Sequence, residues 1–423
     1  MQGDVDLMYN LGVDAYRFSI SWSRIFQNGS GTVNQAGVDY YNNLIDTLVA
    51  SGLAPVVTLY HFDLPQALQD AYGGWLSPRI ITDYANFAEL CFAAFGDRVK
   101  HWITFNEPHG FIITGYDFGM GAPGRCSVHL PNSTCSVGNS STEPYIVAHN
   151  VLLSHSAAST TYKTKFQEKQ GGQIGITLDM IWIEPMSNST QDSQIVQVAL
   201  DFQVGWFLDP FYFGDYPSSM REKVKERLPV FSKNESEALK GSLDFVGINH
   251  YTTYYAWDIS NNTLAKGVLN NDTFVDAGVL PFPSIDGVPI SNETGASEWL
   301  YVVPWGIRKA VNYIKDRYGN PQVIITENGI DEANLPHNSV EEALQDQKRI
   351  DYHREYLKNL LAAIKEDGCN VTGYFIWSLL DNWEWTSGFT VRFGLHYVDY
   401  KSPGLPRYAK KSADWFQQFL LPY

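Results

Sequence analysis

Basic residues are scarce in this chain. Of its 423 residues, 30 are Lys or Arg against 46 Asp or Glu, which gives a formal net charge of −16. Nucleic acids and anionic membranes bind basic surfaces, so this balance argues against both as the main partner. No apolar run reaches the ~18 residues that a membrane-spanning helix needs. The first residues, Met1 to Asp6, are polar, so we expect no signal peptide in this chain.

Cysteine is rare too, with four residues. Cys126 and Cys135 flank a polar loop that a disulfide between them could close, whereas Cys91 and Cys369 are expected to be unpaired buried thiols. Asn-x-Ser/Thr sequons, by contrast, occur nine times, at Asn28, Asn132, Asn139, Asn188, Asn234, Asn261, Asn271, Asn292 and Asn370. Both features suggest an oxidising compartment, so we expect the full-length protein to enter the secretory pathway and to be extracellular or vacuolar.

Motifs for metals and nucleotides are missing. His353 and Glu355 lack the His-x-x-x-His spacing of a zincin, and Cys126 and Cys135 lack a second cysteine pair. No Gly-x-Gly-x-x-Gly or P-loop pattern follows a predicted strand. We therefore expect no cofactor and no metal. The chain is instead rich in Trp (12) and Tyr (25), which suits a neutral ligand such as a sugar.

A unit of amphipathic helix, glycine and buried strand recurs along the chain. The helix periodicity is clear in residues 38–49, where apolar side chains recur at steps of three and four. Glycine is favoured where a helix ends because it accepts positive φ. The predicted strands cover residues 14–21, 54–60, 99–105, 173–181, 243–248, 322–326 and 371–377.

Strands that alternate with helices predict a parallel sheet, and a closed (β/α)8 barrel has eight strands. Seven are found here. The chain opens on a helix, residues 4–10, and closes on another, residues 412–420, so the simplest interpretation is a barrel whose first strand is missing from this chain. We expect one catalytic domain over residues 1–423, with residues 258–294 as an excursion from the barrel top. An open doubly wound sheet is the alternative.

Two glutamates stand where predicted strands end, in Asn106-Glu107-Pro108 and in Glu327-Asn328-Gly329. The carboxyl ends of barrel strands are where such folds place chemistry. Two facing carboxylates are what cleavage of a glycosidic bond requires, and their separation distinguishes a retaining from an inverting mechanism. These residues alone leave open both the mechanism and which glutamate is the nucleophile. The alternative for either is a salt bridge or a helix cap.

Other predicted strand ends carry groups that suit a sugar site. His61 follows the strand 54–60, Asn249 and Tyr251 follow the strand 243–248, and the last strand runs into Trp377-Ser-Leu-Leu-Asp-Asn-Trp-Glu384-Trp385. Sugars offer hydroxyls to carboxylates and amides, and apolar faces to indoles. Arg17, on the first strand, would hold a neighbouring carboxylate ionised. Structural roles in the core are the alternative for each.

These motifs resemble those of the family 1 glycoside hydrolases, in particular the plant β-glucosidases. The resemblance covers essentially the whole chain through the segments 16–24, 104–108, 122–126, 325–329 and 377–385. It implies a (β/α)8 barrel and a retaining, exo-acting mechanism on terminal β-D-glucosyl residues of O-glucosides. The implied partner is a small-molecule β-glucoside or an oligosaccharide, and the oligomeric state stays open.

The same resemblance assigns roles to residues. Glu107 would be the general acid/base and Glu327 the nucleophile, with Arg17 and Tyr251 against the nucleophile. The substrate-binding residues implied are His61, Asn106, Asn249, Tyr251, Trp377, Glu384 and Trp385, with Trp299 as the aglycone platform and Phe393 at the rim. Cys126 and Cys135 match a loop disulfide of the plant enzymes.

Comparison with the family pattern also narrows the chemistry. Thioglucosidases replace the acid/base with Gln, so the Glu at 107 favours an O-glycoside, and Glu384 favours an unphosphorylated glycosyl unit. One departure is serious, because family members begin with a strand whose Gln binds the sugar, and we expect that segment to be missing here. Two rival functions follow, a catalytically impaired glucoside-binding protein and a transglucosidase that uses the same intermediate.

Overall fold

The computed structural model of the protein describes residues 2–127, 135–262 and 272–421. Its centre is a seven-stranded parallel sheet in which the strand order follows the chain order. The strands are β1 (Ala15–Ser19), β2 (Ala54–Tyr60), β3 (His101–Asn106), β4 (Gln173–Asp179), β6 (Phe245–Asn249), β11 (Val323–Glu327) and β13 (Val371–Tyr374). All seven predicted strands are therefore confirmed, although several are shorter than predicted.

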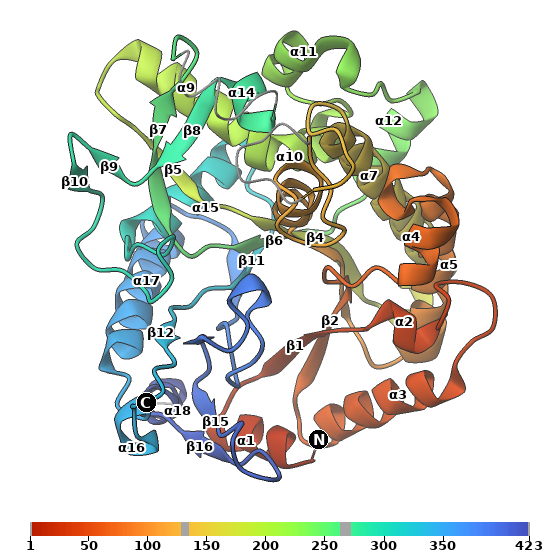
Figure 1. Cartoon of the computed structure of the whole chain (residues 1–423). Helices are drawn as coiled ribbons and strands as arrows, with labels where there is room; N and C mark the ends of the chain where they lie inside the picture. The colour runs from red at the N-terminus through yellow and green to blue at the C-terminus, as the bar shows by residue number, and fades with distance from the viewer. Residues whose placement is uncertain (1, 128–134, 263–271, 422–423) are drawn as a thin grey trace.

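Helices lie outside this sheet, and in Figure 1 the strands curve around the middle of the molecule. The longer helices are α1 (Gln2–Leu11), α3 (Gln35–Ala50), α5 (Arg79–Phe95), α7 (Glu143–Lys165), α9 (Thr190–Leu200), α10 (Trp206–Phe213), α15 (Trp305–Tyr318), α17 (Gln347–Lys365) and α18 (Lys411–Leu420). A doubly wound sheet reverses its strand order at a switch point. Here the strand order follows the chain order without reversal, as in a barrel. This excludes the open doubly wound sheet.

Among the described residues, β1 and β13 each have one neighbour in the sheet, so they are its two edges. Inside the curl, Val56, Ile103, Phe245 and Ile324 form one buried cluster, with one residue each from β2, β3, β6 and β11. Barrel interiors are likewise filled by layers of side chains that several strands contribute. The interior is therefore a packed core, and chemistry is left to the strand ends.

Part of the excursion predicted at residues 258–294, residues 263–271, lies outside the described residues, and the described remainder is separate from the main sheet. A three-stranded sheet consists of β5 (Trp182–Pro185), β7 (Thr253–Asp258) and β8 (Val279–Phe282), and a hairpin pairs β9 (Ser284–Ile285) with β10 (Val288–Pro289). These elements follow the carboxyl ends of β4 and β6 and lie together at one side of the molecule (Figure 1).

The predicted disulfide between Cys126 and Cys135 is present, with Cα atoms 5.7 Å apart. Cys91 and Cys369 are free and buried, as predicted. In the described part of the chain, no helix has the length and apolar character needed to cross a bilayer.

The register between neighbouring strands places the strand ends that carry predicted site residues at one edge of the sheet. Asn106 pairs with Thr177, Asp179 pairs with Asn249, and Asn249 pairs with Glu327 across β3, β4, β6 and β11. Because parallel strands end at the same edge of a sheet, residues far apart in sequence meet there.

Candidate active site

Glu327 is the last residue of the fully buried strand β11. Arg17 Nη1 donates to its Oε1 at 2.7 Å, and the Tyr251 hydroxyl donates to its Oε2 at 2.8 Å. The side chains of Arg17 and Glu327 are each 6% exposed. A buried carboxylate needs a cation and hydrogen-bond donors to stay charged, and Glu327 has both.

Glu107 lies in a different environment. It follows β3, caps the short helix α6 (Pro108–Ile112), and adopts the left-handed conformation with φ of 43°, which costs a non-glycine residue of order 1–3 kcal/mol. Its backbone N–H donates to the Thr177 carbonyl at 2.9 Å. Burial, followed by the negative charges of Glu327 and Asp179, raises the pKa of the Glu107 carboxyl well above its usual range. Glu107 is thus set to carry a proton.

Amide side chains connect the two glutamates. Asn249 Nδ2 donates to Glu107 Oε1 at 2.7 Å and to Asn106 Oδ1 at 3.1 Å. Arg17 Nη2 donates to that same Asn106 oxygen at 2.5 Å, while Nη1 holds Glu327. One hydrogen-bonded chain therefore runs from Glu107 to Glu327, although Arg17 and Glu327 are 310 residues apart.

His61 extends this network. Asn106 Nδ2 lies 3.1 Å from His61 Nε2, and burial together with the Arg17 charge lowers the pKa of His61 to about 3. The imidazole is therefore neutral, and Nε2 accepts from the amide while Nδ1 carries the proton. His61 also stacks on Trp385, with ring centroids 5.3 Å apart.

The segment after β13 carries the third carboxylate of the predicted site. Glu384 accepts from Trp377 Nε1 at 3.3 Å and from Asn382 Nδ2 at 2.9 Å. Burial raises the pKa of Glu384 to about 7. The Trp377 ring lies 6.0 Å from His61, so this segment meets the end of β2.

Aromatic side chains adjoin Tyr251. Trp299, 44% exposed, meets the Tyr251 ring edge-on with centroids 5.8 Å apart. Phe393, expected at the rim, is instead buried and packs edge-on against Tyr251 at 6.1 Å. Trp299 thus offers a partly exposed indole next to the Tyr251 ring, whereas Phe393 packs against Tyr251 from within.

The turn after Glu327 depends on its own sequence. A Cβ atom at Gly329 would lie 2.0 Å from the Trp377 carbonyl oxygen, so only glycine fits there. Asn328 Nδ2 donates to the His250 carbonyl at 2.6 Å. The Glu-Asn-Gly sequence therefore fastens the end of β11 to the residues that follow β6 and β13.

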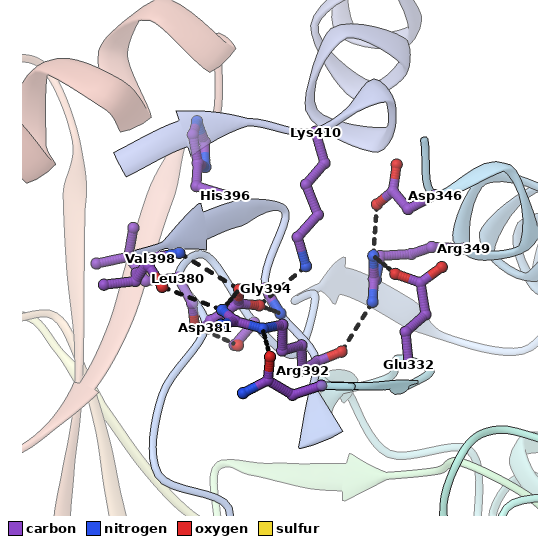
Figure 2. Close-up of polar contacts among 12 residues, drawn as sticks. Glu332, Asp346, Arg349, Leu380, Asp381, Arg392, Gly394, His396, Val398 and Lys410 are labelled. Carbon is purple, nitrogen blue, oxygen red and sulfur yellow. Dashed lines mark hydrogen bonds and ion pairs between the residues drawn. The ribbon is translucent and has the colours of Figure 1, made fainter. Parts of the chain in front are cut away.

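Asp381, within the segment 377–385, belongs to a largely buried group of charges, the Asp381 cluster (Figure 2). Its members are Glu332, Asp346, Arg349, Asp381, Arg392 and Lys410. Asp381 accepts from Arg392 Nη1 at 2.5 Å, from Lys410 Nζ at 2.9 Å and from the Gly394 backbone N–H at 3.0 Å.

The Asp381 cluster links two loops of the site. Arg349 Nη2 donates to the Arg392 carbonyl at 2.9 Å, its Nε donates to the Ile330 carbonyl at 3.3 Å, and its Nη1 pairs with Glu332 at 3.1 Å. The residues just after Glu327 are thereby joined to the loop that carries Glu384. Three cations balance three anions, so burial of the cluster leaves no net charge.

Replacing Lys410 by Met is expected to lower the free energy of unfolding by about 3–5 kcal/mol, because it leaves a buried carboxylate without one of its two cations. Lys410 and Asp381 are both buried in the folded chain. The matched control is Lys358→Met, which removes an exposed pairing with Glu355 and should cost at most about 1 kcal/mol. Denaturant unfolding measures both, and equal effects would contradict this account.

One residue at this edge was not predicted. The strand 173–181 was predicted to run through Asp179, whereas β4 ends there, and Asp179 lies 2.7 Å from His109 Nδ1 through its Oδ2. The rule that located Glu107 and Glu327, a carboxylate at a strand end, would have found it with the correct strand boundary. Among the described residues, no group of three or more His, Cys, Asp or Glu side chains is arranged to hold a metal ion.

The sheet is that of a parallel barrel, with one carboxyl directly after its third strand and another at the end of its sixth. One of the two is held by a cation and the other has a raised pKa, which defines an enzyme that cleaves glycosidic bonds. Residues 1–421 match the family described as Glycosyl hydrolase family 1, and the chain belongs to that family. The predicted resemblance and the predicted fold class, a (β/α)8 barrel, are confirmed.

Relatives and solved structures agree with this assignment. The chain is 59% identical over 417 residues to Beta-glucosidase 40 of Arabidopsis thaliana, covering 99% of this chain and 81% of the relative. It is 57% identical over 417 residues to Beta-glucosidase 6 of Oryza sativa subsp. japonica, covering 99% and 79%. The crystal structure of the rice β-glucosidase Os3BGlu6 superposes with a TM-score of 0.97 at 56% identity, covering 100% of this chain and 87% of that one. A Humicola insolens β-glucosidase in complex with glucose gives 0.92 at 40% identity, covering 99% and 86%.

Proposed function

We propose that this glycoside hydrolase is a retaining, exo-acting β-glucosidase that hydrolyses terminal non-reducing β-D-glucosyl residues of O-glucosides by double displacement. Glu327 is the nucleophile and Glu107 the general acid/base. The observation that carries this proposal is the unequal environment of the two glutamates. Arg17 and Tyr251 hold Glu327 as a carboxylate, whereas burial and nearby anions keep a proton on Glu107. The names of the similar proteins support the glucoside as substrate.

In the first step Glu327 attacks the anomeric carbon. The bond from that carbon to the aglycone oxygen breaks, and the proton of Glu107 passes to the leaving oxygen. Bond formation neutralises Glu327, so one of the anions that raise the pKa of Glu107 disappears. Glu107 can then take a proton from water, whose oxygen displaces Glu327 and releases glucose. The charge of Glu327 is lost when the glycosyl-enzyme forms and returns when it is hydrolysed. Glu107 therefore acts as an acid in the first step and as a base in the second.

The remaining predicted residues would bind the two halves of the substrate. His61, Asn106, Glu384 and Trp385 would hydrogen-bond the glucosyl hydroxyls, Asn249 would lie beside the site, and Trp377 would lie beneath the sugar ring. Trp299 would stack on the aglycone, supported by its exposed indole, and Phe393 would act through Tyr251. We further propose that residues 1–423 work as a single catalytic domain.

Passage through the secretory pathway is proposed as well. The Cys126–Cys135 disulfide is supported best in an oxidising compartment. Seven of the nine sequons begin at described residues, and all seven asparagines are exposed: Asn28, Asn139, Asn188, Asn234, Asn261, Asn292 and Asn370. The sequons at Asn132 and Asn271 lie outside the described residues.

Proton NMR of the first glucose released from an aryl β-glucoside tests the mechanism. Double displacement predicts that β-glucose appears first and the α-anomer grows in later by mutarotation. If α-glucose appears first, the mechanism is inverting and Glu327 is a base. If the substrate binds without turnover, the protein is a glucoside-binding protein. Addition of an alcohol separates hydrolysis from transfer, because a transglucosidase would form the alkyl glucoside in preference to glucose.

A further inference from the structure

A second carboxylate, Asp179, lies near Glu107 across Gly110. Asp179 ends β4, the strand between β3 and β6. Asn106, next to Glu107, is in register with Thr177, and Asp179 is in register with Asn249. The strand order therefore places Asp179 at the same sheet edge as Glu107.

Asp179 is tied to the first turn of α6, the helix that Glu107 caps. Its Oδ2 lies 2.7 Å from His109 Nδ1, and the Gly110 N–H donates to its Oδ1 at 3.3 Å. His109 in turn packs edge-on against the buried Trp206, with centroids 6.3 Å apart. These contacts fix the backbone directly after Glu107, whose own conformation is strained.

Gly110 lets the two carboxyls approach each other. A Cβ atom at this position would lie 3.2 Å from Glu107 Oε2 and 3.9 Å from Asp179 Cγ. Glu107 Oε1 is engaged by Asn249, so its Oε2 is the oxygen that faces Gly110 and Asp179. The charge of Asp179 therefore acts on Glu107 across a gap that holds no larger side chain.

We propose that Asp179, held by His109, is a positioning residue that keeps the proton on Glu107 until the aglycone leaves, an inference that rests on the roles proposed above for Glu107 and Glu327. The anion of Glu327 is lost when the glycosyl bond forms. Asp179 takes no part in the bonds that form and break, so bond formation does not neutralise it. Asp179 thus raises the proton affinity of Glu107 at every stage, whereas the contribution of Glu327 is lost and regained during each cycle.

The charges that face Glu107 make this testable. Burial raises the pKa of Glu107 most, followed by the charge of Glu327 and then that of Asp179. The hydrogen bond from Asn249 and the charge of Arg17 lower it. Tyr251 faces it as a neutral phenol, because burial raises the pKa of Tyr251 well above its usual range. Removing the charge of Asp179 leaves the burial of Glu107 and the charge of Glu327 in place, so the proton affinity of Glu107 should fall only in part.

The first experiment is the pH dependence of kcat/KM for an alkyl β-glucoside with Asp179→Asn. Asparagine keeps the shape and the Oδ1 acceptor for Gly110 but removes the charge. Glu107 must be protonated to act as the acid. Its lower proton affinity in this variant should therefore move the alkaline limb to lower pH by about one unit. The control is Asp244→Asn, which removes a similarly half-buried anion paired with Lys163 just before β6, away from the strand ends. Its alkaline limb should stay in place.

His109→Phe provides the opposite test. Phenylalanine keeps a ring against Trp206 but removes the donor that shields Asp179, so the alkaline limb should move to higher pH. Shifts of opposite sign support the proposal, whereas a purely structural role would lower the rate in both variants without moving the limbs. An alkaline limb that stays within about 0.2 unit of wild type in folded Asp179→Asn overturns it. If the wild-type protein cleaves no β-glucoside at all, the proposed function fails instead.

Discussion

Replacing Glu327 by Ala should lower kcat for an aryl β-glucoside by about 10⁴-fold or more, because the covalent step has no other nucleophile at that position. Arg17 and Tyr251 would remain but have no carboxylate to hold. Binding should suffer far less, since the sugar contacts lie on other residues. The measurements are kcat with a dinitrophenyl glucoside and the dissociation constant of glucose.

Azide distinguishes loss of the nucleophile from general damage. In Glu327→Ala a small anion can occupy the vacated space and attack the anomeric carbon directly. A single displacement gives the α-glucosyl azide, because only one inversion occurs. Glu237→Ala, which removes an exposed carboxylate near Lys233, is the control and should leave kcat unchanged. A β-azide product from the Glu327 variant would contradict the assignment.

The unpaired cation also has a structural consequence. Without Glu327, the buried Arg17 guanidinium keeps only Asn106 as a side-chain partner among the contacts described above. Glu327→Gln restores an acceptor without restoring the nucleophile. Turnover should be lost in both variants, whereas stability should be lower in the Ala variant than in the Gln variant, because an uncompensated buried charge is costly.

Sequence patterns predicted the strands well because burial between helices leaves a strong local signal. The strand 54–60 was predicted with the bounds that β2 has. Strand ends were less accurate, as in the strand 173–181, because hydrogen bonding to neighbouring strands decides where a strand stops. That error concealed Asp179.

The candidate site also has parts that the sequence predicted and parts that it did not. A strand-end rule and family motifs located Glu107 and Glu327, but nothing local in the sequence links Asn249 to Glu107 or Arg17 to Glu327. Both contacts join strands that are not neighbours in the sheet, β6 with the end of β3 and β1 with β11, so they depend on the curl of the whole sheet. The Asp381 cluster was out of reach for a different reason. Lysine is almost never fully buried, so the pattern around Lys410 favours an exposed side chain, and only the surrounding anions reverse that preference.

Replacing Glu107 by Ala should produce a loss that depends on the leaving group. A poor leaving group such as an alkoxide needs the proton of Glu107, so kcat/KM for an alkyl glucoside should fall by about 10²–10⁴-fold. A dinitrophenolate leaves without protonation, so glycosylation by that substrate should stay close to wild type. Hydrolysis of the intermediate still needs a base, so the glycosyl-enzyme should accumulate, and kcat and KM should both fall.

Three readouts check this variant together. Pre-steady-state kinetics with the dinitrophenyl glucoside should show a burst of one equivalent of phenolate. The alkaline limb of kcat/KM should disappear, because Glu107 is the group that must be protonated and its pKa is raised by burial, Glu327 and Asp179. Azide needs no base, so it should speed turnover and give the β-glucosyl azide through two inversions. The opposite azide anomers from the Glu107 and Glu327 variants would assign the two roles, and exchanged anomers would reverse them.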